Sequence, residues 1–300
     1  MTTKVIEASI KLPKPKGTIS IQVGNKSYQE ENLFTVYGMG RLTTSNAIVM
    51  NTTGGIFINC KVGSGTTPIT INSTALSAAY AANSTRSNTV LNYVTSAGQR
   101  YAQLTSTFSF PTGSIVGNIT EIMLCPAASN ANMLCGKLLD VAVPVIASEQ
   151  VVIVYTVRVP IVSTFTQIAS GNVTLNGTNT NYVLEAQLHS ESATSLISQF
   201  PFPTARTSAN YSDFYVNSAS LGASNGSYEC VKTVNGLQIE YLLKCDILGF
   251  VPSTPITVFG FGSYYQGATY SLRFVFDIPF TKPLNLNFRT YVKLTILWEA

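Results

Sequence analysis

Apolar and polar positions alternate along most of the chain in short runs rich in Val, Ile, Thr, Tyr and Phe. Clusters of Gly, Asn, Ser and Pro separate these runs, a pattern typical of β-strands joined by turns. Residues 150–159 (QVVIVYTVRV) and 291–298 (YVKLTILW) predict strands that are buried on one face and partly covered on the other. The best helical candidate is residues 73–82 (STALSAAYAA), with Ser73 or Thr74 as its cap. The pattern as a whole predicts an all-β protein.

Two segments of the chain repeat the same order of features. Each begins with Ile-Thr, at Ile119 and at Ile256, and continues through a polar turn into an apolar strand that contains a proline, Pro144 or Pro279. The offsets are 137 between the isoleucines and 135 between the prolines, so a two-residue insertion or deletion in the turn reconciles them. Each segment therefore predicts a hairpin, a loop after the proline and a long final strand.

Three strands cannot close a core alone, so each segment needs further strands from upstream. We therefore expect two tandem antiparallel β-sandwich domains of jelly-roll type, related by duplication, at residues 32–165 and 166–300. Residues 1–31 are expected to supply an extended N-terminal arm and the first strands. The boundary is placed between Ile161 and Asn181, where the sequence is rich in Ser, Thr, Gly and Asn. The alternative to duplication is that apolar β sequences resemble one another through composition alone.

Charged residues make up only 11% of the chain, where about 25% is typical of soluble domains. The chain nevertheless has 15 Tyr and 15 Phe and a mean hydropathy of +0.23, which excludes a disordered protein. Few charges and many aromatic residues are also the composition of a protein interface at its buried centre. We therefore expect partner subunits to cover much of the surface. The alternative is a neutral, Thr-rich surface of the kind that secreted adhesins have.

The charges and the apolar runs argue against two classes of partner. The net charge of +4 is spread thinly, so neither nucleic-acid binding nor a cofactor is expected. The start MTTKVIEASI has no apolar signal region and no apolar run reaches 18 residues, so we expect synthesis in a cytoplasm and no membrane span. The densest basic stretch, Lys11, Lys14 and Lys16 among two prolines, predicts an exposed extended arm, with a short phosphate-contacting tail as the alternative.

Five cysteines lack Cys-x-x-Cys spacing and are accompanied by one histidine, so a closed zinc site is not expected. We expect buried free thiols. The alternative concerns Cys125 and Cys135, which flank a Ser/Asn-rich turn and could oxidise to a cross-strand disulfide after release from the cell.

The residues offer little for catalysis. His189 lies in a polar stretch without the context of a hydrolytic base, and no acidic residue has the aromatic surroundings of a sugar-cleaving site. Asp140 and Asp277 recur near the matched prolines, and we expect each to satisfy a local turn or a backbone donor. Glu121 has Val258 at the matching place in the second segment, which argues against a role required in both. We therefore expect a non-enzymatic protein.

Several short motifs occur in an order known from phage virion proteins. They are residues 32–39 (NLFTVYGM), 61–68 (KVGSGTTP), 73–76 (STAL), 119–124 (ITEIML), 137–139 (KLL) and 149–157 (EQVVIVYTV). Over residues 32–160 the chain resembles structural proteins of bacteriophage tails, necks and fibres, and through the repeat the resemblance extends to residues 256–298. The family carries Gly-Leu-Gly where this chain has residues 123–125 (MLC), and Asp in place of Ser73. The Gly63-Ser64-Gly65 stretch is expected to form a tight turn, because no Lys-Ser/Thr follows that would make it a phosphate loop.

The resemblance implies a structural component of the virion in the tail, neck or collar, or at a fibre, which assembles with itself and with other virion proteins. We expect its interfaces at three places: Lys11, Lys14 and Lys16; Phe200 and Phe202; and the loop with Tyr264 and Tyr265. The alternative for these aromatic residues is packing within the same subunit. A second candidate function is a receptor-binding or carbohydrate-binding module of a tail fibre, which would contact a host glycan or receptor. A third is a subunit of a bacterial injection machine or surface adhesin.

Overall fold

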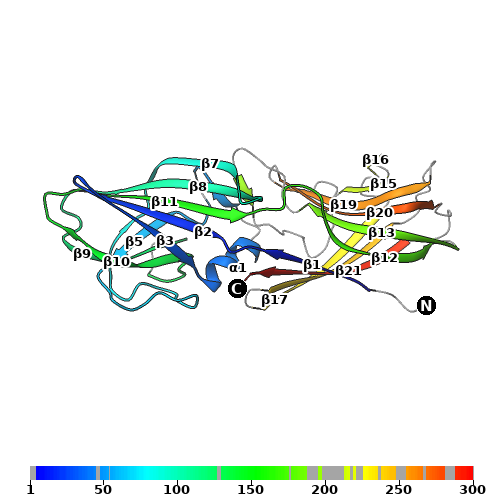
Figure 1. Cartoon of the computed structure of the whole chain (residues 1–300), viewed down its shortest axis with the longest axis horizontal. Helices are drawn as coiled ribbons and strands as arrows, with labels where there is room; N and C mark the ends of the chain where they lie inside the picture. The colour runs from blue at the N-terminus through cyan, green and yellow to red at the C-terminus, as the bar shows by residue number, and fades with distance from the viewer. Residues whose placement is uncertain are drawn as a thin grey trace. The chain divides into compact units, whose positions relative to one another are not determined.

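The computed structural model shows a chain built almost wholly of β-strands, as the alternating pattern predicts (Figure 1). It forms two compact units, which we describe separately. The structure describes residues 5–44, 48–53, 55–126, 130–175, 177–187, 195–197, 213–216, 219–220, 226–235, 238–247, 255–265, 268–280 and 288–299.

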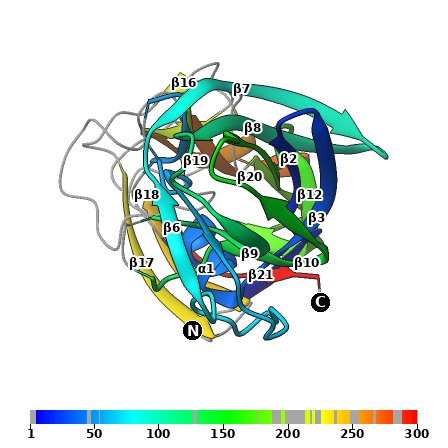
Figure 2. The ribbon, with the colours of Figure 1, turned by 90° about the vertical axis from the view of Figure 1, so that its left-hand side faces the viewer.

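The N-terminal unit comprises residues 13–161 and the short strand β14 (Ser195–Ile197). Its strands pair in the order β6-β5-β9-β10-β3-β2-β11-β8-β7. Strand β3 pairs along most of its length with β2 and at its end with β10, so it belongs to both layers of a β-sandwich (Figure 2). The elements are β2 (Lys16–Val23), β3 (Lys26–Phe34), α1 (Val36–Thr44), β4 (Ile48–Asn51), β5 (Asn59–Gly63), β6 (Ala79–Asn83), β7 (Arg86–Ser96), β8 (Gln99–Phe110), β9 (Gly117–Cys125), β10 (Cys135–Val145) and β11 (Val151–Pro160).

The C-terminal unit comprises β1 and the strands that follow residue 161, except β14. One sheet has the order β1-β21-β18-β17 and the other β12-β13-β20-β19-β15-β16. Its core includes a cluster of aromatic rings, among them the stacked pair Phe259 and Phe274 with ring centroids 6.0 Å apart. The strands are β1 (Val5–Leu12), β12 (Thr166–Leu175), β13 (Thr178–Gln187), β15 (Asp213–Val216), β16 (Ala219–Ser220), β17 (Gly226–Asn235), β18 (Gln238–Ile247), β19 (Ile256–Tyr265), β20 (Ala268–Phe280) and β21 (Phe288–Trp298).

The two units repeat the same strand pairings in the same order. The hairpins β2–β3, β5–β6, β7–β8 and β9–β10 have counterparts in β12–β13, β15–β16, β17–β18 and β19–β20. Between hairpins, the pairs β3–β10, β5–β9 and β8–β11 have counterparts in β13–β20, β15–β19 and β18–β21. A duplication of one ancestral unit would produce this correspondence. The common descent of the two units stays a prediction.

Both β9–β10 and β19–β20 contain the same bulge. Residues 139–142 bulge opposite Thr120, and residues 276–279 bulge opposite Thr257. The pairs that close the bulges, Ile119 with Val143 and Ile256 with Phe280, keep one offset of 137. The expected match of Pro144 with Pro279 is therefore wrong by two positions. The pairs on both sides of each bulge keep this offset, so the expected two-residue change of length in the turn is absent.

The two units differ in the strand that lies beside the long final strand. In the N-terminal unit β11 pairs with β2, antiparallel. In the C-terminal unit the counterpart of β2 is β12, which among the described strands pairs with β13 alone. The place beside β21 is filled by β1, which runs parallel to it (Figure 1). A strand from the start of the chain thus completes the sheet at its end.

Several local expectations are corrected by the structure. Residues 11–16 are no free arm, because Lys11 lies in β1, Lys16 begins β2 and only residues 13–15 link the two strands. The Ser/Thr/Gly/Asn-rich stretch around residues 166–181 is not a separator but belongs to the β12–β13 hairpin. The expected long strands are confirmed: β11 alternates buried and half-buried residues along its length, and so does β21 over residues 291–298.

The helix lies elsewhere than expected. Residues 73–82 form turns and the start of β6, whereas α1 follows β3. Thr35 caps α1, because its hydroxyl accepts a hydrogen bond from the Gly38 N–H at 3.1 Å and its carbonyl accepts one from the Met39 N–H at 3.0 Å. The same hydroxyl donates to the Met133 carbonyl, which fastens the start of the helix to the segment that precedes β10.

Candidate functional site

A buried carboxylate joins the motifs that carry the phage resemblance. Glu121 lies in β9 and is fully buried. Its Oε1 accepts hydrogen bonds from the Ala78 N–H at 2.7 Å and the Gly65 N–H at 3.2 Å. Its Oε2 accepts from the N–H and the hydroxyl of Ser77, at 3.0 and 3.1 Å. One side chain therefore satisfies four donors of the loop between β5 and β6.

The two glycines of the Gly63-Ser64-Gly65 stretch are there for space and not for a tight turn. A Cβ on Gly63 would lie 2.4 Å from Glu121 Oε1, and a Cβ on Gly65 would lie 1.8 Å from Ser77 Oγ. Neither glycine has a positive φ. The motif around residue 63 and the motif around residue 121 therefore form one hydrogen-bonded structure. The sequence indicates it only through the single Glu within the otherwise apolar run ITEIML.

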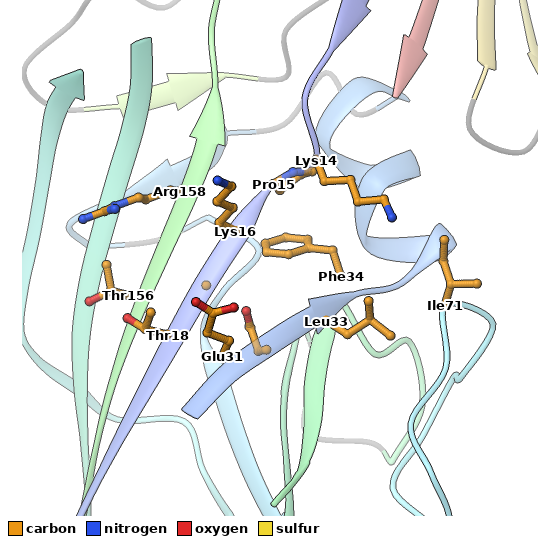
Figure 3. Close-up of a pocket in the computed structure, with 12 residues that line it drawn as sticks. Lys14, Pro15, Lys16, Thr18, Glu31, Leu33, Phe34, Ile71, Thr156 and Arg158 are labelled. Atoms are coloured by element: carbon orange, nitrogen blue, oxygen red, sulfur yellow. The ribbon is translucent and has the colours of Figure 1, made fainter. Parts of the chain in front are cut away.

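A groove with a cavity volume of about 400 Å³ opens over β2, β3 and β11 (Figure 3). The link and the start of β2 contribute Lys14 and Lys16, and β11 contributes Arg158. Phe34 is a buried aromatic part of the wall, held edge-to-face by Phe57 with ring centroids 6.1 Å apart. Two of the predicted interface residues, Lys14 and Lys16, are thus brought together in one concave surface.

The basic side chains of this groove do not converge on one point. Lys16 and Arg158 are directly opposite in the β2–β11 ladder, an arrangement in which like charges repel. Arg158 turns its Nε to donate to Gln103 Oε1 at 2.6 Å. In Figure 3 the charged ends of Lys14 and Arg158 point to opposite sides. The groove therefore suits an extended ligand with spaced negative or polar groups better than a single small anion.

The described lining of the groove carries basic, polar and apolar side chains. Glu31 is its one carboxylate, and no His or Cys lines it. Hydrolysis of a glycoside needs two carboxyl groups, and nucleophilic catalysis needs a base beside the nucleophile. Asn32 adds a polar group, since its Nδ2 donates to the Tyr155 hydroxyl at 3.1 Å while its buried Oδ1 has no partner among the described residues.

The cysteines whose side chains are described are free thiols in the core. Cys60, Cys125 and Cys135 are buried and none of the three forms a disulfide, so Cys125 and Cys135 are not linked. In the ladder Cys135 lies opposite Leu124 and Cys125 opposite Asn59. Burial raises the pKa of the Cys60 and Cys135 thiols, which keeps them protonated and poorly nucleophilic.

Asp140 and Asp277 lie at the same place in the two bulges, at the offset of 137. Asp277 Oδ1 accepts hydrogen bonds from the Thr180 hydroxyl and from the Asn181 N–H, both at 2.8 Å, so the expected backbone donor is confirmed. Asp140 instead forms an ion pair with Lys137 at 2.8 Å and is exposed. The two residues therefore stabilise their bulges through different partners.

Asp277 gives a prediction for acid stability. The hydrogen bond from the Thr180 hydroxyl, followed by those from Asn181, lowers the pKa of Asp277. Because the pKa is lowered in the folded state, the stabilisation is present above the ordinary pKa and is lost as the pH falls through the lowered value. We expect Asp277→Asn, which keeps an acceptor oxygen, to flatten the loss of stability below about pH 4, near the ordinary Asp pKa.

Urea denaturation at a series of pH values, followed by Trp298 fluorescence, measures this effect. Asp140→Asn is the matched control, because an exposed ion pair contributes about 0–1 kcal/mol. An unchanged acid limb in Asp277→Asn would show that the hydrogen bonds to this carboxylate do not depend on its charge.

The predicted aromatic interface residues have mixed outcomes. Tyr264 and Tyr265 lie in strand β19 and not in a loop, because they pair with Thr269 and Ala268 of β20. Phe200, Phe202 and His189 lie outside the described residues. An interface at Lys14 and Lys16 stays a prediction. The sequence did not indicate the groove, because its walls come from strands far apart in the chain.

Three further observations complete the description of candidate sites. Among the described residues, no group of three or more His, Cys, Asp or Glu side chains is placed to hold a metal ion. Within the same part of the chain, no helix is long and apolar enough to cross a membrane. No protein family model, no curated protein and no solved structure matches the chain.

Proposed function

We propose that the chain is a non-enzymatic structural component of a bacteriophage virion, in the tail, neck or collar or beside a fibre, which assembles as a homo-oligomer and contacts other virion proteins. The sequence motifs support this proposal, and the Glu121 network gives them a structural reason to occur together. A low content of charge supports covered surfaces. Its place would be in the particle after synthesis in the host cytoplasm.

The observation that carries the assembly proposal is an exposed aliphatic residue at the same place in both bulges. Val141 in the N-terminal unit is 65% exposed, and Ile278, its counterpart, is 46% exposed. In the N-terminal unit, Val116 and Ile146 flank the end of the β9–β10 ladder and are 60% and 61% exposed. Single exposed aliphatic residues are ordinary, but an exposed aliphatic residue at the same place in both bulges supports a contact surface there.

A charged residue in place of Val141 tests the proposal. We expect the Val141→Asp variant to have a lower molar mass than the wild-type oligomer, closer to that of the monomer. An unpaired carboxylate in an apolar contact is costly. Light scattering coupled to size-exclusion chromatography measures the molar mass over a range of concentrations. The control is Val90→Asp, at a residue of β7 that is 55% exposed and lies outside the bulges of β9–β10 and β19–β20. A wild-type chain that stays monomeric at every concentration would contradict the proposal.

A second candidate function is a receptor-binding or carbohydrate-binding module, and the groove over β2, β3 and β11 favours it. Its apolar wall and spaced polar groups are suited to an extended glycan. The scattering experiment separates the two candidates, because a glycan-binding module does not require self-association. Binding of a host surface polysaccharide by a strict monomer would support this second function.

A further inference from the structure

Strand β1 is matched in register and burial to one edge of strand β21. It pairs with β21 in parallel over its whole length, from Val5 opposite Tyr291 to Leu12 opposite Trp298. Ala8, Ile10 and Leu12 are buried, whereas the residues between them are exposed. This alternation fixes the register, because a slip by one residue would turn the apolar side chains outward.

The place that β1 fills is one that the rest of the C-terminal unit leaves open. In the N-terminal unit the equivalent place beside β11 is taken by β2, which is continuous with its own hairpin. In the C-terminal unit the equivalent strand, β12, pairs with β13 and not with β21, and β1 occupies that edge of β21. Among the described strands, β21 would therefore be an edge strand paired with β18 alone if a strand with the pattern of residues 5–12 were not added.

The connection between β1 and the rest of the chain is short and stiff. Only residues 13–15 (PKP) separate β1 from β2. The two prolines fix their φ angles and lack an N–H donor. Short hinges that cannot relax favour the exchange of the element beyond them between copies, since every contact of that element is reproduced in the second copy.

We propose that β1 is exchanged between copies, so that residues 5–12 of one copy complete the β21 sheet of a second copy. This inference rests on the proposed homo-oligomer and names how its copies are joined. The occupant is this chain's own strand, because register and burial match it residue by residue. Reciprocal exchange between two copies gives a closed dimer, whereas exchange in one direction gives a ring or a filament according to the rotation from one copy to the next.

Cross-linking between two differently sized copies tests the exchange. Ser9 and Thr295 are opposite each other in the β1–β21 ladder and lie toward the outer face. We mix a tagged Ser9→Cys chain with an untagged Thr295→Cys chain, refold them together at high concentration, oxidise them and separate the products without reductant. The expected result is a disulfide-linked species that contains one chain of each size.

The control pair is Ser9→Cys with Thr233→Cys. Thr233 lies in β17, in the same row of the same sheet but three strands from Ser9, about 14 Å away at the usual strand spacing. Each single variant alone gives the background from the native thiols. A cross-link that forms only when Ser9→Cys and Thr295→Cys are in one chain, within that chain, would overturn the exchange. If light scattering still shows an oligomer in that case, the proposed assembly stands and only the exchange fails.

Discussion

Replacement of Glu121 with Gln is expected to lower the free energy of unfolding of the N-terminal unit by about 2–4 kcal/mol, although the two side chains have nearly the same shape. The carboxylate accepts four hydrogen bonds and donates none. In the amide, an NH₂ group would face either the N–H groups of Gly65 and Ala78 or the donors of Ser77. Each buried donor left unsatisfied costs about 1–3 kcal/mol.

Urea denaturation followed by far-ultraviolet circular dichroism measures the loss, while the single tryptophan, Trp298, reports the C-terminal unit separately. The matched control is Val258→Ala, at the equivalent place in β19, with an expected cost of about 1 kcal/mol. If Glu121→Gln is neutral while Glu121→Ala is not, the side chain serves to fill space and its acceptor atoms are dispensable.

Replacement of Ile10 with Asp is expected to destabilise the C-terminal unit by about 3–5 kcal/mol and to expose Trp298. Ile10 is buried beneath the β1–β21 ladder, and an unpaired carboxylate there is costly. If β1 leaves its place, Trp298, which is opposite Leu12 and 5% exposed, loses its cover. We expect its fluorescence emission to shift to longer wavelength before the rest of the unit unfolds.

The adjacent Ser9→Asp is the control for Ile10→Asp, because Ser9 is on the same strand and faces solvent. It should change neither the emission maximum nor the urea midpoint by more than the error of the measurement. Equal effects of the two variants would mean that β1 tolerates charge on both faces and does not contribute to the core of the unit.

Much of the architecture could be predicted from local pattern, because strand alternation and turn residues are local properties. The hairpins β9–β10 and β19–β20 and the long strands β11 and β21 followed directly from it. The helical prediction for residues 73–82 failed for a tertiary reason. The N–H groups of Ser77 and Ala78 bond to Glu121 rather than to carbonyls of a helix, and β6 pairs with β5.

The partners of strands distant in sequence could not be predicted. Nothing in residues 5–12 indicates pairing with residues 291–298. Pro13 and Pro15 led to the prediction of an extended arm instead. The matched prolines also misled the alignment of the two segments, since a bulge moves residues along the strand without changing its composition. The groove was missed for the same reason, because Lys16 and Arg158 meet only through the β2–β11 ladder.

The pairing of β1 with β21 also determines the order of events during synthesis. At typical elongation rates of about 5–20 residues per second, roughly 15–60 s pass between the completion of residues 5–12 and that of residues 291–298. During this time an apolar strand has no partner of its own and is exposed to aggregation. Three lysines and two prolines lie at the end of this segment and just after it. Charged residues and prolines next to an apolar strand reduce its tendency to aggregate; here they are Lys11, Pro13, Lys14, Pro15 and Lys16. The basic stretch at residues 11–16 is thus expected to limit aggregation of β1 before the chain has folded.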